Sequence, residues 1–280
     1  MGLVLGICSA LIWGVAGVTA GLGSRMVGPF RMITWGLVLG MALAVPLAVL
    51  SGAPGHIDLR VAIWIVVVAA GMLSGMVFVN AGMRRGSISV VAPISALYGG
   101  FSALLSIVLG EPVTALAIAS LIIAVLGGVL AASGQTAAPG AQYSNQRAAA
   151  GFAALAAVVW GIQLYAGGQI EVELGPSWLV LIARSLGLIV LVAVLLPRGA
   201  LRVPRKVLPY ALVTGCGEVA GFTLYLHASN YGIAEASVLT GQYGTVAALI
   251  GLVVLKERLR GIQYVGLAMI VIAVVGLSIA

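Results

Sequence analysis

Hydrophobic residues run along the chain in long stretches that are separated by short groups of glycine, proline or charged residues. A transmembrane helix needs about 20 mainly apolar residues, and each stretch has about that length. The pattern therefore predicts an all-α integral membrane protein with ten transmembrane helices. We place the spans at residues 3–22, 29–50, 60–82, 87–109, 113–132, 148–167, 176–196, 207–229, 235–255 and 260–279.

Composition supports this interpretation. Of the 280 residues, 62% are hydrophobic and only 8% are charged, whereas a soluble domain is about half apolar and a quarter charged. An ordinary soluble protein is therefore excluded, and so is a disordered chain, which requires low hydrophobicity. The two cysteines, Cys8 and Cys216, have no spacing typical of a metal site or a disulfide framework. We expect neither a metal nor a cofactor.

The two halves of the chain repeat each other. The segment 10–14, which contains Trp13, recurs as 157–161 with an offset of 147 residues, and the glycines of 71–75 recur in 217–221 with an offset of 146. Further matches are Gly28-Pro29 with Gly175-Pro176, Gly86 with Gly232, and Glu111 with Glu257. They predict a five-helix repeat at 1–134, a polar linker at 135–147 and a second five-helix repeat at 148–280. Because five is odd, the second repeat must cross the membrane in the opposite direction, as an inverted repeat.

Basic residues gather in the connections that follow the odd-numbered spans. Those connections carry eleven Lys and Arg residues, and the connections after even-numbered spans carry Arg60 alone. The eleven are Arg25, Arg84, Arg85, Arg147, Arg198, Arg202, Arg205, Lys206, Lys256, Arg258 and Arg260. Cytoplasmic loops hold the excess of basic residues, so this bias predicts that both termini lie outside the cytoplasm. It also explains the net charge of +7 as a topology signal, and we expect no nucleic-acid partner.

Several motifs are shared with a known family. Each repeat has a Trp-Gly pair in its first span, at Trp13-Gly14 and Trp160-Gly161, and a glutamate junction follows its fourth span, best seen at Glu257-Arg258-Leu259. Pro176 is followed eight residues later by Arg184. In these features the whole chain resembles the EamA branch of the drug/metabolite transporter superfamily. The resemblance implies a ten-helix fold and export of small metabolites, but it does not choose among amino acids, sugars and drugs.

One feature departs from that family pattern. Members commonly have a proline partway along the fourth span of each repeat, thirteen residues before the junction glutamate. Tyr98 and Gly244 occupy those positions here, and Pro93 precedes Tyr98 by five residues. We therefore expect the helix break in the fourth span of the repeat to be displaced.

Two ionisable residues, Arg184 and Glu218, fall near the middles of spans 7 and 8. A charged side chain at that depth costs about 2.5–3.5 kcal/mol on insertion scales, so each needs a partner or a function. Three interpretations remain open. The two residues form a structural ion pair, or they bind the carboxylate and the amine of a substrate, or Glu218 carries a proton coupled to transport. The equivalent of Glu218 in the first repeat is Met72, so its role occurs only once.

Further polar and aromatic residues fall in the middle of the spans. Glu218, Phe222 and Tyr225 share one face of span 8, and Trp160 and Gln163 share one face of span 6. Each residue taken alone is also compatible with packing or helix–helix hydrogen bonding. Together they are typical of a cavity wall, and the candidate substrate-binding residues are Trp13, Asn80, Ser95, Tyr98, Trp160, Gln163, Arg184, Glu218, Tyr225, Thr240 and Gln242.

Glu111 and Glu257 directly precede the predicted spans 5 and 10. A carboxylate at a helix start interacts favourably with the positive end of the helix dipole. We therefore expect both glutamates to have a structural role at these helix starts.

Taken together, the sequence predicts a secondary active transporter that exports small organic metabolites, with amino acids favoured, by alternating access. The alternative is an importer or passive facilitator of small metabolites such as sugars. We expect no enzyme, because the sequence has no pattern of a nucleophile with a base, and no P-loop for ATP. The expected partners are a small-molecule substrate and the lipid bilayer, and the expected state is a monomer in a prokaryotic inner membrane.

Overall fold

The structure is a computed structural model that describes residues 1–83, 85, 91, 94–132, 145–199, 201–246, 250 and 261–278. These residues form ten α-helices and one short 3-10 helix, with no β-strand among them. The elements are α1 (Gly2–Val27), α2 (Pro29–Leu50), α3 (Leu59–Met83), α5 (Tyr98–Val108), α6 (Ala115–Ala132), α7 (Gln146–Leu174), α8 (Pro176–Leu195), η1 (Arg205–Val207), α9 (Leu208–Ser229), α10 (Ile233–Gly241) and α12 (Gly261–Ser278). The predicted all-helical fold class is confirmed.

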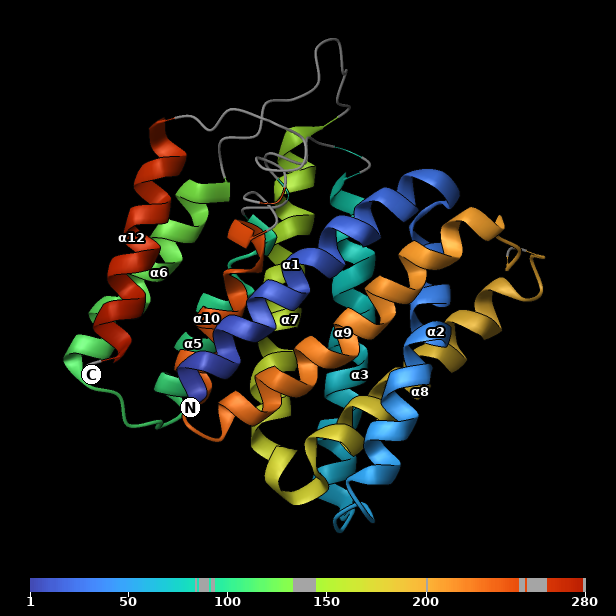
Figure 1. Cartoon of the computed structure of the whole chain (residues 1–280), viewed down its shortest axis with the longest axis horizontal. Helices are drawn as coiled ribbons and strands as arrows, with labels where there is room; N and C mark the ends of the chain where they lie inside the picture. The colour runs from blue at the N-terminus through green and yellow to red at the C-terminus, as the bar shows by residue number, and fades with distance from the viewer. Residues whose placement is uncertain are drawn as a thin grey trace.

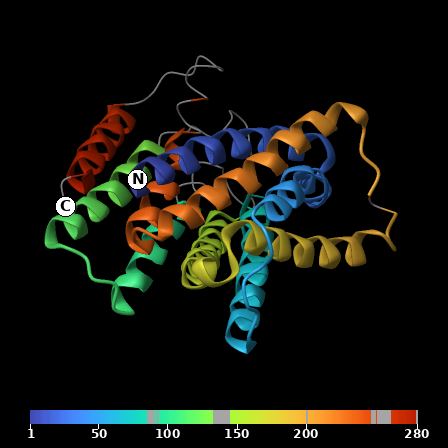
Figure 2. The ribbon, with the colours of Figure 1, turned by 60° about the horizontal axis from the view of Figure 1, so that its bottom comes forward.

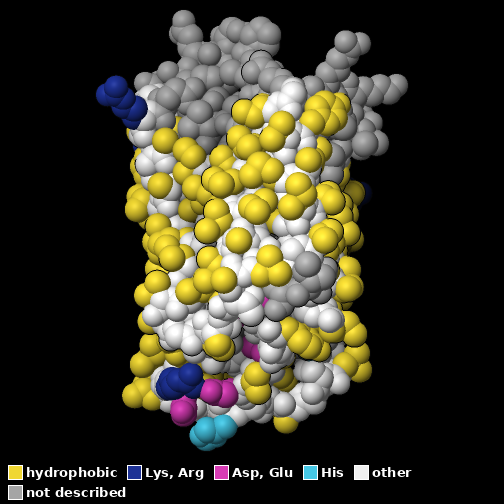
Figure 3. Space-filling model, turned by 90° about the vertical axis from the view of Figure 1, so that its left-hand side faces the viewer, with side chains coloured by type: hydrophobic (Ala, Val, Ile, Leu, Met, Phe, Trp, Pro, Cys, Tyr) yellow, Lys and Arg dark blue, Asp and Glu magenta, His cyan; other side chains and the backbone are white. Residues whose placement is uncertain are grey.

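The surface of the molecule is hydrophobic. Six helices, namely α1, α2, α3, α7, α8 and α9, are long and apolar enough to cross a membrane, and α5, α6 and α12 contain shorter apolar stretches. Large apolar side chains such as Leu50 (83% exposed) and Val172 (78%) point outwards. Figure 3 shows hydrophobic side chains over most of one face, with charged side chains gathered mainly near its lower end. Such a surface requires lipid as its solvent, so the protein is a multi-pass membrane protein.

Two helix pairs, each with one member from each half, pack in the same way. α1 packs along α9, and α3 packs along α7; Figures 1 and 2 both show α1 and α9 side by side. α1 corresponds to α7 in the sequence repeat and α3 corresponds to α9, so exchanging the two halves turns one pair into the other. The last helices of the two halves, α6 and α12, also pack together. This is the arrangement of an inverted repeat with a pseudo-two-fold axis between its halves.

The repeated glycine pairs lie where these helices cross. A Cβ added to Gly71 would lie 2.8 Å from the Cβ of Gln163 in α7, and one added to Gly217 would lie 2.9 Å from the Cβ of Ala16 in α1. Ala16 and Gln163 are themselves repeat partners, 147 residues apart. The small residues thus allow the same close helix approach at both crossings.

The turn between the first two helices is also repeated. Gly28 has φ +86° and Gly175 has φ +88°, values that only glycine adopts without strain. In each half the following proline is the first residue of the next helix, where its missing N–H costs no intrahelical hydrogen bond. The two turns share this backbone geometry, which explains why Gly-Pro occurs at both positions.

The helix bounds differ from the predicted spans in two ways. α7 continues to Leu174, seven residues past the predicted end of span 6, so that Glu171 and Glu173 are helical. Spans 4 and 9 are interrupted: residues 96–97 form a turn before α5, and Gln242 is a turn residue between α10 and the helical residues 243–246. Positions 96 and 242 are repeat partners with an offset of 146. The interruption therefore lies at the same place in both halves, two residues before Tyr98 and two residues before Gly244.

The start of α1 and the end of α12 lie at one side of the bundle. Figure 1 places both at its lower side together with the 51–58 loop, whereas the loop between α8 and η1 lies at the upper right. Four of the eleven basic residues counted above lie outside the described residues, namely Arg84, Lys256, Arg258 and Arg260. Gly86, Pro93, Glu257 and positions 135–144 of the predicted linker also lie outside the described residues.

Candidate functional site

Six aromatic side chains gather where the two halves meet. They come from α1, α5, α7, α9 and the helical residues that follow α10, so both repeats contribute. We call this group the aromatic cluster, and its members are Trp13, Tyr98, Trp160, Phe222, Tyr225 and Tyr243.

Tyr98 lies at the centre of the aromatic cluster. Its ring centroid lies 6.5 Å from that of Trp13 and 5.9 Å from that of Trp160, with interplanar angles of 78° and 83°. The Tyr243 ring stacks on it at 5.7 Å. Both indoles thus meet Tyr98 edge-to-face, a favoured geometry for aromatic pairs. The three rings enclose Tyr98 on three sides.

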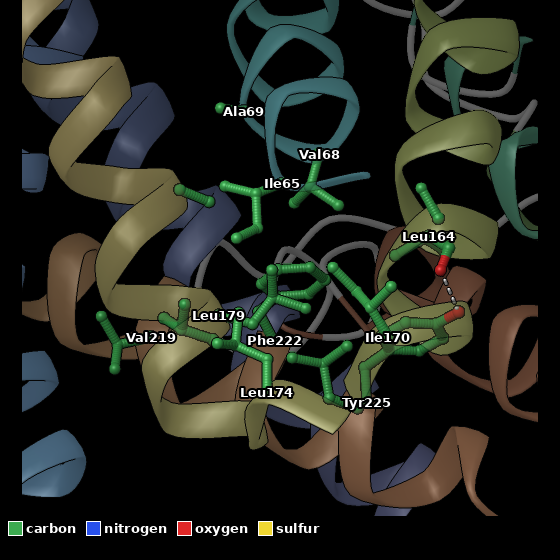
Figure 4. Packing of buried hydrophobic residues seen from close by; sticks show 14 of the residues in the cluster. Ile65, Val68, Ala69, Leu164, Ile170, Leu174, Leu179, Val219, Phe222 and Tyr225 are labelled. Atoms are coloured by element: carbon green, nitrogen blue, oxygen red, sulfur yellow. Dashed lines mark hydrogen bonds between the residues drawn. The ribbon is translucent and has the colours of Figure 1, made fainter. Parts of the chain in front are cut away.

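The base of the aromatic cluster is formed by α9. Phe222 stacks on Trp13 at 6.4 Å and on Tyr225 at 6.0 Å. Figure 4 shows Phe222 and Tyr225 among the buried side chains of this core, where the Tyr225 hydroxyl donates a 2.8 Å hydrogen bond to the carbonyl of Leu164 in α7. This bond ties α9 to α7 within the second half of the chain.

The aromatic cluster lies beside the two helix interruptions. Tyr98 is the first residue of α5, directly after the 96–97 turn, and its hydroxyl is 3.5 Å from the carbonyl oxygen of Thr240 near the end of α10. The hydroxyls of Ser102 and Ser237 join α5 to α10 at 2.8 Å. In inverted-repeat transporters, interrupted helices near the membrane centre mark the binding site.

Three members of the aromatic cluster are only half-buried. Trp13, Trp160 and Tyr243 all pack against the main core, yet each keeps exposed surface. Tyr98 (5% exposed) and Phe222 (6%) are buried. The exposed surface of Trp13, Trp160 and Tyr243 is where a substrate could contact the aromatic cluster.

The carboxyl residue Glu218 lies on α9, next to the aromatic cluster. It is half-buried and lies one helical turn before Phe222 on the same face. Its carboxyl group is close enough to Tyr98, Tyr243 and Arg184 to interact with them electrostatically. The structure therefore places a carboxyl group at the side of the aromatic cluster.

Arg184 lies where α2, α8 and α9 cross. It is 5% exposed, and its Nη2 donates to the backbone carbonyl of Gly36 at 3.3 Å. A Cβ on Gly40 would lie only 2.8 Å from the same nitrogen, so the glycine leaves the room that the guanidinium occupies. Within the described ranges Arg60–Glu173, at 2.6 Å, is the one ion pair, so Arg184 and Glu218 make no direct pair.

The other predicted residues have varied contacts. Gln163 packs over Gly71 at the α3–α7 crossing, and the Asn80 amide donates to Met76 in its own helix. Gln242 donates to the carbonyl of Ala124 in α6 at 3.1 Å. Gln163 and Gln242 thus contribute to contacts between helices, and the amide of Asn80 bonds within α3.

Two predicted residues do join the aromatic cluster at its margin. Ser95 hydrogen-bonds to Tyr243, and the carbonyl oxygen of Thr240 faces the Tyr98 hydroxyl. The structure thus brings together Trp13, Ser95, Tyr98, Trp160, Glu218, Tyr225 and Thr240. It places Gln163, Arg184 and Gln242 at contacts between neighbouring helices, and Asn80 bonds within its own helix.

A small pocket lies beside the interruption, between α5, α6 and α10. Its wall includes Gly100, Val125, Gly128, Gln242 and Thr245. Most of this wall is apolar, and Gln242 and Thr245 supply its polar groups. The pocket lies where Gln242, directly after α10, donates to the carbonyl of Ala124 in α6.

Sequence reasoning missed two important residues. Tyr243 was not among the candidates, although it follows Gln242, which was. Glu171 was placed outside the spans, yet it is 1% exposed and accepts a 3.0 Å hydrogen bond from the Asn230 amide. The signal for Glu171 was the position of the helix end, which hydropathy alone locates poorly.

Glu111 contacts a helix start other than the one expected. It lies before α6, but its carboxylate accepts from the backbone N–H of Ala234 at 3.1 and 3.3 Å, in the first turn of α10. The favourable interaction with a helix dipole is therefore present, but it links the first half of the chain to the second. Glu257 lies outside the described residues.

The inverted helical repeats and the site at their meeting point define a membrane protein of the transporter class. The family model of the EamA-like transporter family matches residues 1–133 and 147–279. The chain therefore belongs to the EamA-like transporter family, whose members are membrane transporters of small molecules.

The fold is also found among solved structures. One crystal structure, described only as "Crystal structure of protein", superposes with a TM-score of 0.77 and covers 99% of this chain and 96% of its own chain. The two sequences are 15% identical, so the similarity shows a shared fold and nothing about substrate. No curated protein matches this chain.

Proposed function

We propose that the protein is a secondary active transporter that exports small organic metabolites, with amino acids as the favoured substrates, by alternating access. The observation that carries this proposal is the aromatic cluster, which joins both halves next to their interrupted helices. Half-buried indoles offer apolar surface to a substrate side chain, and Glu218 offers a charge for its amino group. Because both halves contribute residues to the aromatic cluster, a movement of one half relative to the other would change how the cluster binds a substrate.

The symmetry of the helix contacts supports alternating access. The α1–α9 and α3–α7 crossings use equivalent glycines, so each half can adopt the packing of the other without new types of contact. We propose that the repeats at 1–134 and 148–280 exchange conformations in this way. The exchange would open the site first to one side of the membrane and then to the other.

We further propose that the protein acts as a monomer in the inner membrane of a prokaryote, with both termini outside the cytoplasm. The bias of eleven basic residues against one supports this orientation. Both halves of one chain contribute residues to the aromatic cluster, which supports a monomeric unit. Export is the direction that the family resemblance implies.

Glu218 is the residue we propose for proton coupling. It is a carboxyl group inside a span, it occurs in only one repeat, and it makes no direct ion pair with Arg184 within the described residues. A carboxylate that is free of an ion pair can bind either a proton or a substrate amine, but not both at once. Competition of this kind couples proton flow to substrate flow.

The proposal is tested in proteoliposomes that contain the full chain. Labelled amino acids and sugars are offered with and without a pH gradient, to the wild type, to Glu218→Gln and to Glu173→Gln. Glu173 is the matched control because it is an exposed carboxylate at the end of α7, paired with Arg60. We expect an amino acid to accumulate with the pH gradient in the wild type and in Glu173→Gln, and no accumulation in Glu218→Gln.

The same assay can contradict each part of the proposal. Equilibration that needs no gradient and survives Glu218→Gln would identify a passive facilitator. Transport of sugars in place of amino acids would overturn the substrate class. Accumulation only when the gradient has the polarity for uptake would identify an importer.

A further inference from the structure

The charged groups around the aromatic cluster are distributed unequally. On α9, Gly215 comes one turn before Glu218 and Phe222 comes one turn after it. A Cβ on Gly40 of α2 would lie 2.8 Å from the Arg184 Nη2 and 2.7 Å from the Gly215 carbonyl oxygen, so Arg184 and Gly215 pack against the same glycine. The Glu218 carboxyl group interacts electrostatically with Arg184 and also with Tyr98 and Tyr243 of the aromatic cluster, and it therefore lies between the two. The Glu218 carboxyl group is therefore nearer to the aromatic cluster than the Arg184 guanidinium is.

Arg184 is held in a way that keeps it from a substrate. Its side chain is 5% exposed, its Nη2 donates to Gly36, and Gly40 of α2 leaves the room that the guanidinium occupies. Its Nε is buried with no hydrogen-bond partner among the described residues. Moving the guanidinium towards the aromatic cluster would break the bond to Gly36, so the position favours helix packing over binding of a substrate carboxylate.

The aromatic cluster itself suits a positive group. The rings of Trp13 and Trp160 stand nearly perpendicular to Tyr98, and both indoles keep exposed surface. The Nε1 edge of Trp13 is turned to Gly221, 2.6 Å from where a Cβ would lie, so the indole offers its ring rather than its N–H donor. Aromatic faces attract cations, most strongly when the site is shielded from water.

We infer that the site recognises its substrate by a positively charged amino group, held between the aromatic cluster and Glu218, and that it does not require a substrate carboxylate. The chemical class is small organic amines with an apolar body, which includes amino acids. This inference rests on the proposed transport function. It adds that the amino group is the necessary recognition element.

Three probes of one size separate the contributions of the two charges. Phenylalanine carries an amino group and a carboxylate, 2-phenylethylamine carries only the amino group, and 3-phenylpropionate carries only the carboxylate. Binding is measured by tryptophan fluorescence of the purified full chain at neutral pH, since two of its five tryptophans belong to the aromatic cluster. We expect phenylalanine and 2-phenylethylamine to bind alike, and 3-phenylpropionate to bind about tenfold more weakly or worse.

Variants test whether Glu218 causes this preference. In Glu218→Gln the difference between 2-phenylethylamine and 3-phenylpropionate should disappear, Glu218→Asp should keep it, and Glu173→Gln should bind all three probes as the wild type does. The wild-type comparison needs no variant, so a Glu218 variant that fails to fold does not prevent the test.

Other results would overturn the inference. Stronger binding of 3-phenylpropionate than of 2-phenylethylamine would assign recognition to the carboxylate. Binding of phenylalanine alone would show that both charges are needed. If none of the three probes binds, amine recognition by the rings is also refuted. The transport assay then decides separately whether the proposed function stands, because it uses a wider range of amino acids and does not depend on these probes.

Discussion

The indole of Trp13 in α1 lies directly over Gly221 in α9, with its Nε1 only 2.6 Å from the position that a Cβ on Gly221 would take. The repeat partners show the same relationship, because the indole of Trp160 in α7 lies over Gly75 in α3. The glycines remove the side chain at the place where each tryptophan must fit. The two indoles of the aromatic cluster are therefore positioned by the same contact in both halves.

This contact predicts that Gly221→Ala and Gly75→Ala destabilise the protein. A methyl group at either position overlaps an indole ring, and overpacking of this kind costs about 1–3 kcal/mol. We expect a lower midpoint of thermal unfolding in detergent for both variants. Substrate binding should weaken as well, because the displaced indole belongs to the aromatic cluster.

Gly151→Ala is the matched control for these variants. Gly151 lies in α7, and a Cβ there would meet nothing within 4 Å. Because alanine has the higher helix propensity, its unfolding midpoint should stay the same or rise slightly. An unchanged midpoint in Gly221→Ala would show that Trp13 can move away from α9 without cost.

Much of this arrangement could be predicted from the sequence. Glycine pairs and Trp-Gly motifs that recur at offsets of 146 and 147 gave the repeat, and the repeat gave the inverted topology. Residues that keep a fixed spacing on one helix face, such as Glu218 and Phe222, were placed correctly relative to each other. Helix geometry determines such relations without knowledge of the neighbouring helices.

Contacts between helices could not be predicted in the same way. Arg184 and Glu218 have similar depths, but glycines at 36, 40 and 215 direct the guanidinium towards backbone. Depth follows from position along a span, whereas direction depends on how the helices are rotated about their axes. The partner of Glu111 was missed for the same reason, since α10 comes 122 residues later in the chain.

Glu111 should stabilise the contact between the first half and α10. Glu111→Ala removes both the charge and the hydrogen-bond acceptor from the start of α10, which costs about 1–2 kcal/mol for a helix cap. Glu111→Gln keeps an acceptor and should lose less. Thermal unfolding of the three proteins checks this order, and equal midpoints for wild type and Glu111→Ala would contradict it.

The buried pair of Glu171 and Asn230 should matter more than its single hydrogen bond suggests. Glu171 is 1% exposed, and the Asn230 amide donates to it at 3.0 Å. Asn230→Ala leaves the carboxyl group buried without this donor, at a cost of about 1–3 kcal/mol. Replacing Glu171 by Gln in the same variant should restore part of the lost stability, because a neutral amide is cheaper to bury unpaired.

The exposed ion pair should contribute little by comparison. The side chains of Arg60 and Glu173 are 51% and 44% exposed, and water screens the attraction between them. A double-mutant cycle with Arg60→Gln and Glu173→Gln should give a coupling energy below about 1 kcal/mol that falls further at high salt. A coupling that is large and independent of salt would mean that this pair is shielded in the membrane.

Tyr98 should affect transport through its ring rather than its hydroxyl. The ring contacts Trp13, Trp160 and Tyr243, whereas the hydroxyl lies 3.5 Å from the carbonyl of Thr240, which makes a weak hydrogen bond. Tyr98→Phe should therefore keep most of the transport rate in proteoliposomes. Tyr98→Ala removes three aromatic contacts, each worth about 0.5–1.5 kcal/mol, and should reduce transport at least tenfold. If Tyr98→Phe were as impaired as Tyr98→Ala, the hydroxyl would be the essential group, and the link between α5 and α10 would matter more than the aromatic cluster.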